Sequence, residues 1–489
     1  MAHFDMSSGS FIDIPNPEEV ASYIIFQEGS IIYAKNGKTG DIDFSGTDAT
    51  TVIQSAINAL TSGGTIVIKI GIYIINNYKY VGRTWIDNYG SIYITVNNIK
   101  IVGEKGAILK VKYTSYPSSG RLGVILVHSP AKNCIIEGLE IDGSEMTTPS
   151  IHVMGLYNAY GENVIFRYNY VHDIIGFQIF ADTNNKPYYV VGNVCIGVGT
   201  NDVIGGGGGN AIIANNFIMQ DTTKGFGTHP IGLDMVSANG SIFTGNIIYG
   251  NVLFGSEAAN YYSEISNNIV FPAVGQTSAH CDVLNSSSSN CTIKGNIIYK
   301  GSIYVQGNNH SIIDNQVINS PSYGIDAVGN NHMIANNYIY NSTSDGIVIA
   351  SNGTVVTGNY INTTGSGAKG IVVYGNVNTI TGNIVMNAST CGILLYYVTR
   401  NIVADNICKN NNTGNYTWGD GIRLDHSTYC IVKGNMCYDD RTTKQQQYGI
   451  RETVGCDYNI IEGNIVTPNL TGTIQLTGLN STAIGNIEV

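Results

Sequence analysis

The sequence has few of the residues that mark several common protein classes. Its 489 residues include 10 Pro, 2 Trp and only 24 Lys and Arg, and the formal net charge is −11. Lys and Arg do not cluster, and nucleic-acid binding depends on such clusters because basic side chains release counterions from phosphates. The composition therefore predicts that nucleic acid is not a partner.

Long apolar runs are also missing. No run reaches the roughly 18 residues that a membrane-spanning helix requires. The first residues, MAHFDMSSGSFIDIP, lack both the basic start and the apolar core of a Sec signal peptide. We expect no membrane insertion and no Sec leader.

Cysteine is present, but not in a pattern that indicates cross-links or a metal. The nine Cys residues are an odd number, and none forms a C-x-x-C pair. A disulfide framework and a zinc site are therefore not indicated. We interpret residues such as Cys408 and Cys437, which lie in strand-like segments, as small apolar fillers.

The residues that are abundant favour strands and turns. There are 59 Gly and 32 Tyr, and Ile, Val and Asn recur throughout, whereas strong helix formers are sparse. A phrase of the form x-x-I-x-x-N-x-I returns along the chain, most often after 22 residues. Its asparagines are Asn169, Asn193, Asn216, Asn246, Asn268, Asn296, Asn315, Asn337, Asn359, Asn383, Asn406, Asn435, Asn464 and Asn486.

This repeat predicts a solenoid of short strands. A period in the 20s without a helical pattern is typical of stacked β coils, and no leucine-rich repeat pattern occurs. Alternation in residues 323–340 places Ile325, Ile334 and Ile339 on one face, which stacked coils would bury. The repeated asparagine would form a ladder in which each side-chain amide donates to a carbonyl of the next coil. We predict an all-β, single-stranded, right-handed parallel β-helix of about 14 coils.

The N-terminal part carries a different pattern. From Gly46 the chain reads GTDATTVIQSAINALTSGGTIVIKIGIY. Thr47 or Asp48 can cap a helix in which Ile53, Ile57 and Leu60 share one face, and two glycines end it before a strand. Such a helix would cover the open end of the solenoid. We divide the chain into an N-terminal extension (1–45), the capping helix with the first coils (46–130) and the β-helix proper (131–489).

These residues resemble the start of the pectate-lyase-like superfamily of right-handed β-helices, especially phage tailspikes and glycoside hydrolases. The matching residues are Asp48, Ala49, Thr50, Ile53, Gln54, Ala56, Ile57, Gly63, Gly64, Thr65, Gly71 and Tyr73. The resemblance implies a β-helix fold, a polysaccharide as partner, a possible homotrimer and a place on a virion or cell surface. The motifs of the polygalacturonase branch do not occur in place.

A group of acids lies where the repeat lengthens. The intervals that end at Asn246 and Asn296 exceed the common length, so loops should protrude there as walls of a groove. Four acids fall on four consecutive coils beside these loops, with two histidines just upstream. They are Asp202, Asp234, Glu257 and Asp282, with His229 and His280.

Glycoside hydrolysis needs a carboxylic acid and a carboxylate on either side of the bond. Acids on adjacent coils would be about 5 Å apart and those on alternate coils about 10 Å apart, which leaves both retaining and inverting chemistry open. Asp234 and Asp282 are the leading candidates, with Glu257 between them. No metal site is assigned and no cofactor is required, although the same acids offer oxygen ligands that Ca²⁺ accepts.

A second cluster lies near the C-terminus, where the coils lengthen again. Trp418, Arg423, Asp425 and Arg451 occur on neighbouring coils with His426 and Glu452. They form either a stabilising ladder of Arg and carboxylates or a sugar-binding subsite with the tryptophan as a platform.

The sequence thus predicts a polysaccharide-degrading enzyme, with a glycoside hydrolase favoured. A polysaccharide lyase is less favoured, because no Lys or Arg accompanies the four acids. A non-catalytic glycan-binding adhesin or structural spike is the alternative from a different class.

Overall fold

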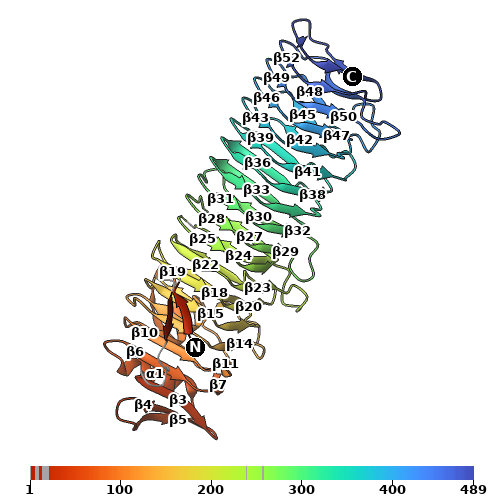
Figure 1. Ribbon diagram of the computed structural model, residues 1–489. Helices are drawn as coiled ribbons and strands as arrows, with labels where there is room; N and C mark the ends of the chain where they lie inside the picture. Colours follow the sequence, from red (N-terminus) through yellow and green to blue (C-terminus); the bar gives the residue numbers. More distant parts are fainter. Residues whose placement is uncertain (1, 6–9, 14–20, 238, 256–257, 489) are drawn as a thin grey trace. The chain divides into compact units, whose positions relative to one another are not determined.

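The computed structural model describes residues 2–5, 10–13, 21–237, 239–255 and 258–488, with side chains from residue 21 onward. The chain divides into two compact units, Met1–Leu233 and Asp234–Val489. In each unit, successive coils contribute one strand to each of three parallel sheets, B, C and D, in that order (Figure 1). A separate antiparallel pair, β1 (Ala2–Asp5) and β2 (Ser10–Asp13), forms sheet A.

The sheets extend through each unit as ladders of short strands. In the first unit, they run from β6 (Gly64–Ile68) to β22 (Ala211–Ala214) in sheet B, from β7 (Gly71–Ile75) to β23 (Phe217–Gln220) in sheet C, and from β9 (Asp87–Ile94) to β21 (Ile204–Gly207) in sheet D. In the second unit, they run from β25 (Ile242–Thr244) to β55 (Thr482–Ile484), from β26 (Ile247–Tyr249) to β56 (Ile487–Glu488), and from β27 (Asn251–Phe254) to β54 (Gly472–Gln475).

The β-helix prediction is confirmed, but the number of coils is larger than expected. The structure contains about 17 coils instead of about 14. The first three coils lack the repeated asparagine and were therefore not counted from the sequence. In the third coil, Leu139 occupies the asparagine position, and its N–H donates to Asn169 Oδ1 at 3.1 Å as an asparagine N–H would.

The repeated asparagines form a buried ladder within each unit. Asn337 is representative: its N–H and its Nδ2 both donate to Asn359 Oδ1 on the next coil, each at 2.9 Å, and its Nδ2 also donates to the Ile312 carbonyl at 2.9 Å. The sequence prediction placed that carbonyl on the next coil, whereas the structure places it on the preceding coil. Each asparagine therefore joins three coils.

The turn before each ladder asparagine explains why glycine or asparagine precedes it so often. Gly358 has a φ of 65° and Asn336 a φ of 55°, both in the left-handed region. Glycine adopts this region without steric cost, and asparagine tolerates it better than most residues. The sharp turn directs the side chain of the following asparagine into the interior. There it forms hydrogen bonds with backbone groups that have no other partner within the coil.

Removing one rung should destabilise the protein measurably. In Asn359→Ala, the Asn337 N–H and Nδ2 lose their acceptor and the Ile334 carbonyl loses its donor, all in buried surroundings. We expect the free energy of unfolding to fall by about 3 kcal/mol. Urea denaturation measures this loss. Asn330→Ala is the control, because Asn330 is exposed and its side chain bonds only with those of Asn308 and Asn352 on the surface; an equal loss in both variants would contradict the ladder's role.

The predicted capping helix is present as α1 (Ala49–Ala59), the single helix in the described residues. Of the two predicted caps, Asp48 is the one used, and its side chain accepts from the Thr50 N–H at 3.1 Å. Ile53 and Ile57 are buried as expected. Leu60, expected on the same face, is the C-cap and is only partly buried, because the chain has already left the helix.

The helix and the residues before it cover one end of the first unit. Gln54 of α1 exchanges two hydrogen bonds with the backbone of Tyr93 on β9, at 2.8 and 3.0 Å. Three strands extend sheet B beyond β6: β3 (Tyr23–Glu28), β4 (Ile31–Asn36) and β5 (Ile42–Gly46). β3 pairs with β6 in parallel, and the β3–β4 and β4–β5 pairs are antiparallel. These additions pair the edge that an open solenoid would leave unpaired.

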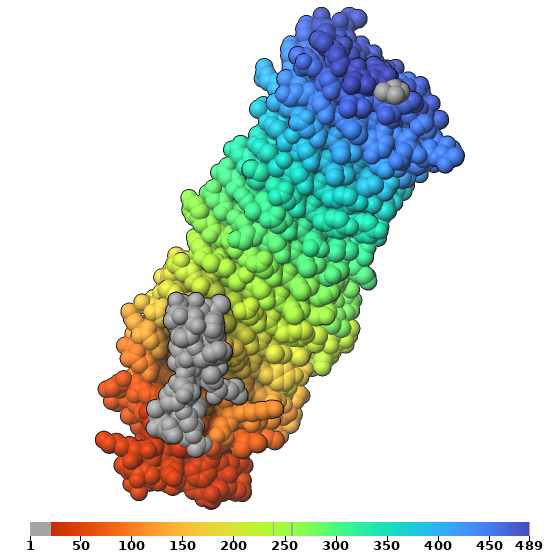
Figure 2. All heavy atoms as spheres, in the orientation of Figure 1, coloured from red at the N-terminus to blue at the C-terminus, as the bar shows by residue number. Residues whose placement is uncertain are grey.

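The interior of the coils is apolar, and the nine cysteines are all buried and free. Ile325, Ile334 and Ile339 are fully buried, as the alternation predicted. In the space-filling view, successive coils of the second unit form adjoining colour bands (Figure 2). None of the helices in the described part of the chain is long and apolar enough to cross a lipid bilayer.

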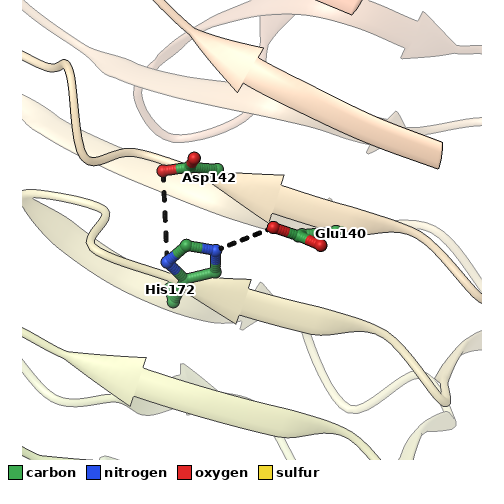
Figure 3. Close-up of side chains that lie close together, drawn as sticks. All are labelled: Glu140, Asp142 and His172. Atoms are coloured by element: carbon green, nitrogen blue, oxygen red, sulfur yellow. Dashed lines mark hydrogen bonds and ion pairs between the residues drawn. The ribbon is translucent and has the colours of Figure 1, made fainter. Parts of the chain in front are cut away.

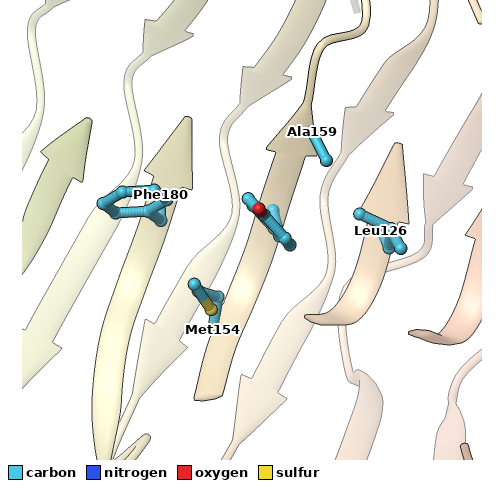
Figure 4. Packing of buried hydrophobic residues seen from close by; sticks show 5 residues of the cluster. Leu126, Met154, Ala159 and Phe180 are labelled. Atoms are coloured by element: carbon cyan, nitrogen blue, oxygen red, sulfur yellow. The ribbon is translucent and has the colours of Figure 1, made fainter. Parts of the chain in front are cut away.

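Sheet D of the first unit also buries residues on its other face. Leu126, Met154, Tyr157, Ala159 and Phe180 form a hydrophobic cluster there (Figure 4). The strands that carry them are β12 (Arg121–His128), β15 (His152–Ala159) and β18 (Gly176–Asp182).

Candidate active site

Three outward residues on sheet D of the second unit form a continuous row. Asp282 pairs in register with Tyr304, and Tyr304 pairs with Asp326. Their neighbours in sequence, such as Cys281 and Val283, are fully buried in the coil interior. Because side chains alternate along a strand, the three residues share the outer face. The strands are β30 (Ala279–Val283), β33 (Gly301–Asn308) and β36 (Ile325–Asn330).

This row lies in a pocket of about 240 Å³. Side chains from three coils and from the loop before β36 surround it, so that residues distant in sequence meet in one space. We call it the carboxyl pocket. Its lining residues are His280, Asp282, Ser302, Ile303, Tyr304, Ser322, Tyr323 and Asp326.

Asp282 is deeply buried although it lies on the outer face, with 8% of its surface exposed. Its Oδ1 accepts a hydrogen bond from the Tyr304 N–H at 3.1 Å. Burial raises the pKa of Asp282 to about 8; the Tyr304 hydrogen bond opposes this rise and the charge of Asp326 adds to it. Asp282 therefore holds its proton at neutral pH.

Asp326 is the second carboxyl group of the pocket. Its Oδ1 is buried and has no hydrogen-bond partner. Burial raises the pKa of Asp326 above the ordinary range of aspartate. The fold thus leaves one acceptor of this side chain unfilled beside the pocket.

A histidine and a hydroxyl group complete one side of the pocket. His280 Nδ1 lies 3.0 Å from Ser302 Oγ, and the His280 N–H donates to Asn251 Oδ1 at 3.1 Å. Burial lowers the pKa of His280, so the ring is neutral at neutral pH. Two of the predicted residues, Asp282 and His280, therefore lie in one pocket.

The other predicted acids lie elsewhere or outside the described part. Asp234 is a buried residue of β24 (Ile231–Met235). On the coil before Asp282, the position in register belongs to Leu253. Glu257 falls outside the described residues.

Asp202 and His229 form a pair in the first unit. His229 Nε2 lies 2.7 Å from Asp202 Oδ1, and Asp202 lies just before β21 rather than on it. A hollow of about 530 Å³ in the same unit is lined largely by hydroxyl groups and includes His152. Its hydroxyl-bearing residues are Ser118, Ser119, Thr148, Ser150 and Thr200. No Asp or Glu is among its lining residues in the described chain.

The C-terminal cluster is held together by an acid that the sequence reasoning did not single out. Asp420 is fully buried, and its Oδ2 lies 2.9 Å from Arg451 Nε and 3.3 Å from Arg423 Nη1. Arg423 also lies 3.4 Å from Asp425, which lies 2.7 Å from His426 Nδ1. Both guanidinium groups are thus engaged within the protein.

Trp418 lies in the loop before β48 (Ile422–Asp425) and packs on sheet D. It covers Val348, Val372 and Leu394, which occupy the same outward row as Asp326 on the following coils. These contacts explain why three outward residues of the row are apolar.

Sequence reasoning missed Tyr304 and Asp326. The signal was the repeat itself: Tyr304 follows Asp282 by 22 residues, which is the commonest interval of the ladder, and Asp326 follows after the same interval again. Counting that interval forward from the first acid would have found both residues.

One cluster has the side chains that could hold a metal ion. Ligand atoms of Glu140, Asp142 and His172 in sheet C of the first unit lie within 4.8 Å of one another (Figure 3). Asp142 is already engaged, because Lys110 Nζ lies 2.6 Å from its Oδ2 and the Ser144 N–H donates to its Oδ1. An ion there would have to displace these partners.

Comparison with known proteins gives low sequence identities. Residues 329–488 match the family model described as a right-handed β-helix region. No curated protein matches the chain. Among solved structures, the mannuronan C-5 epimerase A-module of Azotobacter vinelandii is 14% identical over 90% of this chain and 95% of that chain, with a TM-score of 0.26.

Two further structures are similar at the same level. A periplasmic alginate epimerase is 12% identical over 90% of this chain and 87% of that chain, with a TM-score of 0.36. The receptor-binding domain of the siphovirus 9NA tailspike is 11% identical over 68% of this chain and 72% of that chain, with a TM-score of 0.43. The three parallel sheets and the match of the C-terminal coils to the family model show that the chain has the right-handed parallel β-helix fold of the pectate-lyase-like type.

Proposed function

We propose that the protein is a glycoside hydrolase that inverts the anomeric centre of a neutral polysaccharide at the carboxyl pocket. One observation carries the proposal: Asp282 and Asp326 face the same pocket from alternate coils, with Tyr304 between them. Two carboxyl groups in one space, one protonated and one able to ionise, are the minimum that glycoside hydrolysis requires.

Asp282 acts as the general acid. Its raised pKa keeps the proton on the carboxyl group at neutral pH, where an ordinary aspartate would have lost it. In the reaction, this proton passes to the glycosidic oxygen as the bond to the anomeric carbon breaks, so the leaving sugar departs as a neutral alcohol.

Asp326 acts as the general base. Asp326 lines the pocket, and its carboxylate can accept a proton from a water molecule that attacks the anomeric carbon from the opposite face. The Cα atoms of Asp326 and Asp282 lie about 10 Å apart, because the two residues are two coils apart. A retaining enzyme would need its carboxyl groups about 5 Å apart, whereas an inverting enzyme needs about 6.5–9.5 Å to admit the water.

The charge of the pocket favours a neutral sugar over a uronate. The lining residues of the pocket include two aspartates and no Lys or Arg. A substrate carboxylate bound there would meet negative charge without a compensating cation. The lining also lacks the Lys or Arg that would serve as the base in lyase chemistry. Tyr304 and Tyr323 offer aromatic rings to the apolar faces of sugars.

A panel of purified polysaccharides tests the proposal. We expect new reducing ends from a neutral polysaccharide, no absorbance from unsaturated uronates, and NMR signals of the inverted anomer in the first products. Unsaturated products would indicate a lyase, and binding without cleavage would indicate an adhesin. EDTA in the same assay tests the calcium hypothesis; we expect it to leave the rate unchanged.

Activity should depend on pH in a bell-shaped manner. The alkaline limb should lie near pH 8, where Asp282 loses its proton, and the acid limb above the ordinary pKa of aspartate, where Asp326 becomes protonated. Initial rates across the pH range measure both limbs. An alkaline limb that persists near pH 8 in a variant lacking Asp282 would contradict the assignment.

Stability should fall as the pH rises through the same window. The folded state holds the Asp282 proton up to about pH 8, whereas the unfolded chain releases it near pH 3.8, the ordinary pKa of aspartate. The contribution of this group to the free energy of unfolding is therefore fully present below about pH 4, and it is lost by about pH 8. Urea denaturation of wild type and Asp282→Asn should show that the substitution removes this slope.

A further inference from the structure

Sheet C of the second unit exposes an apolar face, and we propose that a second copy of this chain covers it. A sheet face that stays open to water carries polar residues in alternation with the buried ones, whereas a parallel sheet that is apolar on both faces is usually covered on both. Here the inward residues of sheet C, such as Ile339 and Val385, are fully buried, and most of the outward residues are aliphatic or aromatic. The strands concerned are visible along one side of the unit, among them β29, β38 and β47 (Figure 1).

The first outward row continues through every coil of the unit. Only Gln316 is polar in it, and Ile384, Ile465 and Ile487 are 39%, 37% and 56% exposed. The row is Ile247, Ile269, Ile297, Gln316, Tyr338, Tyr360, Ile384, Ile407, Met436, Ile465 and Ile487. Between β26 and β56 these residues come from β29 (Ile269–Phe271), β32 (Ile297–Tyr299), β35 (Gln316–Ile318), β38 (Tyr338–Ser342), β41 (Tyr360–Thr363), β44 (Ile384–Met386), β47 (Ile407–Lys409), β50 (Met436–Tyr438) and β53 (Ile465–Val466).

A second outward row lies beside the first. It contains Tyr249, Phe271, Tyr299, Ile318, Tyr340, Asn362, Met386, Lys409 and Tyr438. The two rows together are called the sheet C strip. Lys409 is its one charged residue among the described strands, and it is paired with Asp440 at 2.8 Å. The outward face of sheet B in the same unit is different, because it includes Glu264, Lys294 and Lys433.

The size of the strip matches what a pair of copies needs. Its strands are about 4.8 Å apart, so the strip is roughly 48 Å long, and two rows of side chains make it roughly 12 Å wide. Covering it from both sides would bury roughly 1,200 Å², the lower bound of specific protein interfaces. On one copy the strip covers roughly 580 Å², at the upper end of the largest apolar patches that monomers present, and patches of that size often mark an interaction site.

The chemistry of the strip favours a second copy over other occupants. Its rings stack on one another, with Phe271 and Tyr299 at 5.0 Å and 3° and Tyr338 and Tyr360 at 5.0 Å and 12°. The ring faces that meet in these pairs are covered by each other, which leaves mainly ring edges and aliphatic side chains for a partner to contact. A membrane surface would favour free basic side chains beside the apolar face, whereas Lys409, the one charged residue of the strip, is paired with Asp440. The strip of a second copy has the same spacing between its coils. Its side chains can therefore fit between those of the first copy along the whole length of the strip.

A strip that packs on itself forms an isologous pair, so the predicted assembly is a dimer. A trimer, which the resemblance to tailspikes implies, would join two different faces of each copy instead. The proposal does not depend on the proposed hydrolase, because the strip and the carboxyl pocket lie on different sheets.

Sedimentation equilibrium of the full chain tests the dimer. We expect wild type to have twice the monomer mass, and the double variant Ile384→Lys with Met436→Lys to be monomeric with an unchanged circular dichroism spectrum. The control is Met333→Lys with Ile460→Lys on sheet B, whose side chains are similarly exposed (41% and 39%); it should stay dimeric. A monomeric or trimeric wild type would overturn the proposal, as would a strip variant that remains a dimer. Glycan cleavage by the strip variant shows that the pocket is intact.

Discussion

Asp282→Asn is expected to lower the rate of glycan cleavage by about 10²- to 10⁴-fold, the range that a general acid contributes. The asparagine keeps the shape of the side chain and can still accept the Tyr304 hydrogen bond, but it has no proton to give to the leaving oxygen. The loss should appear in kcat more than in KM, because the proton is needed in the transition state rather than for binding. Reducing-end kinetics on the substrate found in the panel measure it.

Asp326→Asn should produce a loss of similar size, because water then has no base to activate it. Asp345→Asn is the matched control: Asp345 is also buried, burial raises its pKa, and it accepts from the Lys369 N–H at 2.8 Å, but it does not line the pocket. That variant should keep the wild-type rate. If both pocket variants cleave at the wild-type rate with their fold intact, the carboxyl pocket is not the active site.

Asp420→Ala is expected to lower the free energy of unfolding by about 3–5 kcal/mol, the cost of removing one partner from buried ion pairs. The change leaves Arg423 and Arg451 without their shared carboxylate, and the Tyr448 N–H loses an acceptor. Urea or thermal denaturation measures the loss. Asp440→Ala is the control, since Asp440 pairs with Lys409 on the surface, and we expect no measurable loss from it.

A second variant, Arg451→Met, separates two interpretations of the C-terminal cluster. If Arg423 and Arg451 are structural, Arg451→Met should reduce stability and leave cleavage and glycan binding unchanged at temperatures where the protein is folded. A variant that folds stably but binds glycan more weakly would instead support the sugar-binding subsite predicted around Trp418.

The fold could be predicted from the sequence because the contacts of a solenoid recur at a regular spacing along the chain. The ladder asparagines, the alternation at Ile325, Ile334 and Ile339, and the cap at Asp48 each reflect contacts within one coil or between adjacent coils. The coil count fell short because Leu139 replaces the asparagine in the third coil, and the first two coils also lack the ladder residue.

The candidate site was predictable only in part. His280 and Asp282 were singled out because they lie on a strand beside a lengthened coil. Tyr304 and Asp326 could have been found by counting the repeat forward from Asp282. The raised pKa values of Asp282 and Asp326 could not be predicted in this way, because burial of an outward carboxyl group depends on which loops fold over the strand.

By itself, the sequence determined that the chain coils, which residues face inward, and which positions stack above one another, because each of these depends on spacing along the chain. The tertiary structure alone decided that Asp326 shares a pocket with Asp282, that Asp420 engages both arginines, and that the sheet C strip is left open. These features depend on the paths of the loops and on what packs over the outer face, which a repeat of short strands does not encode.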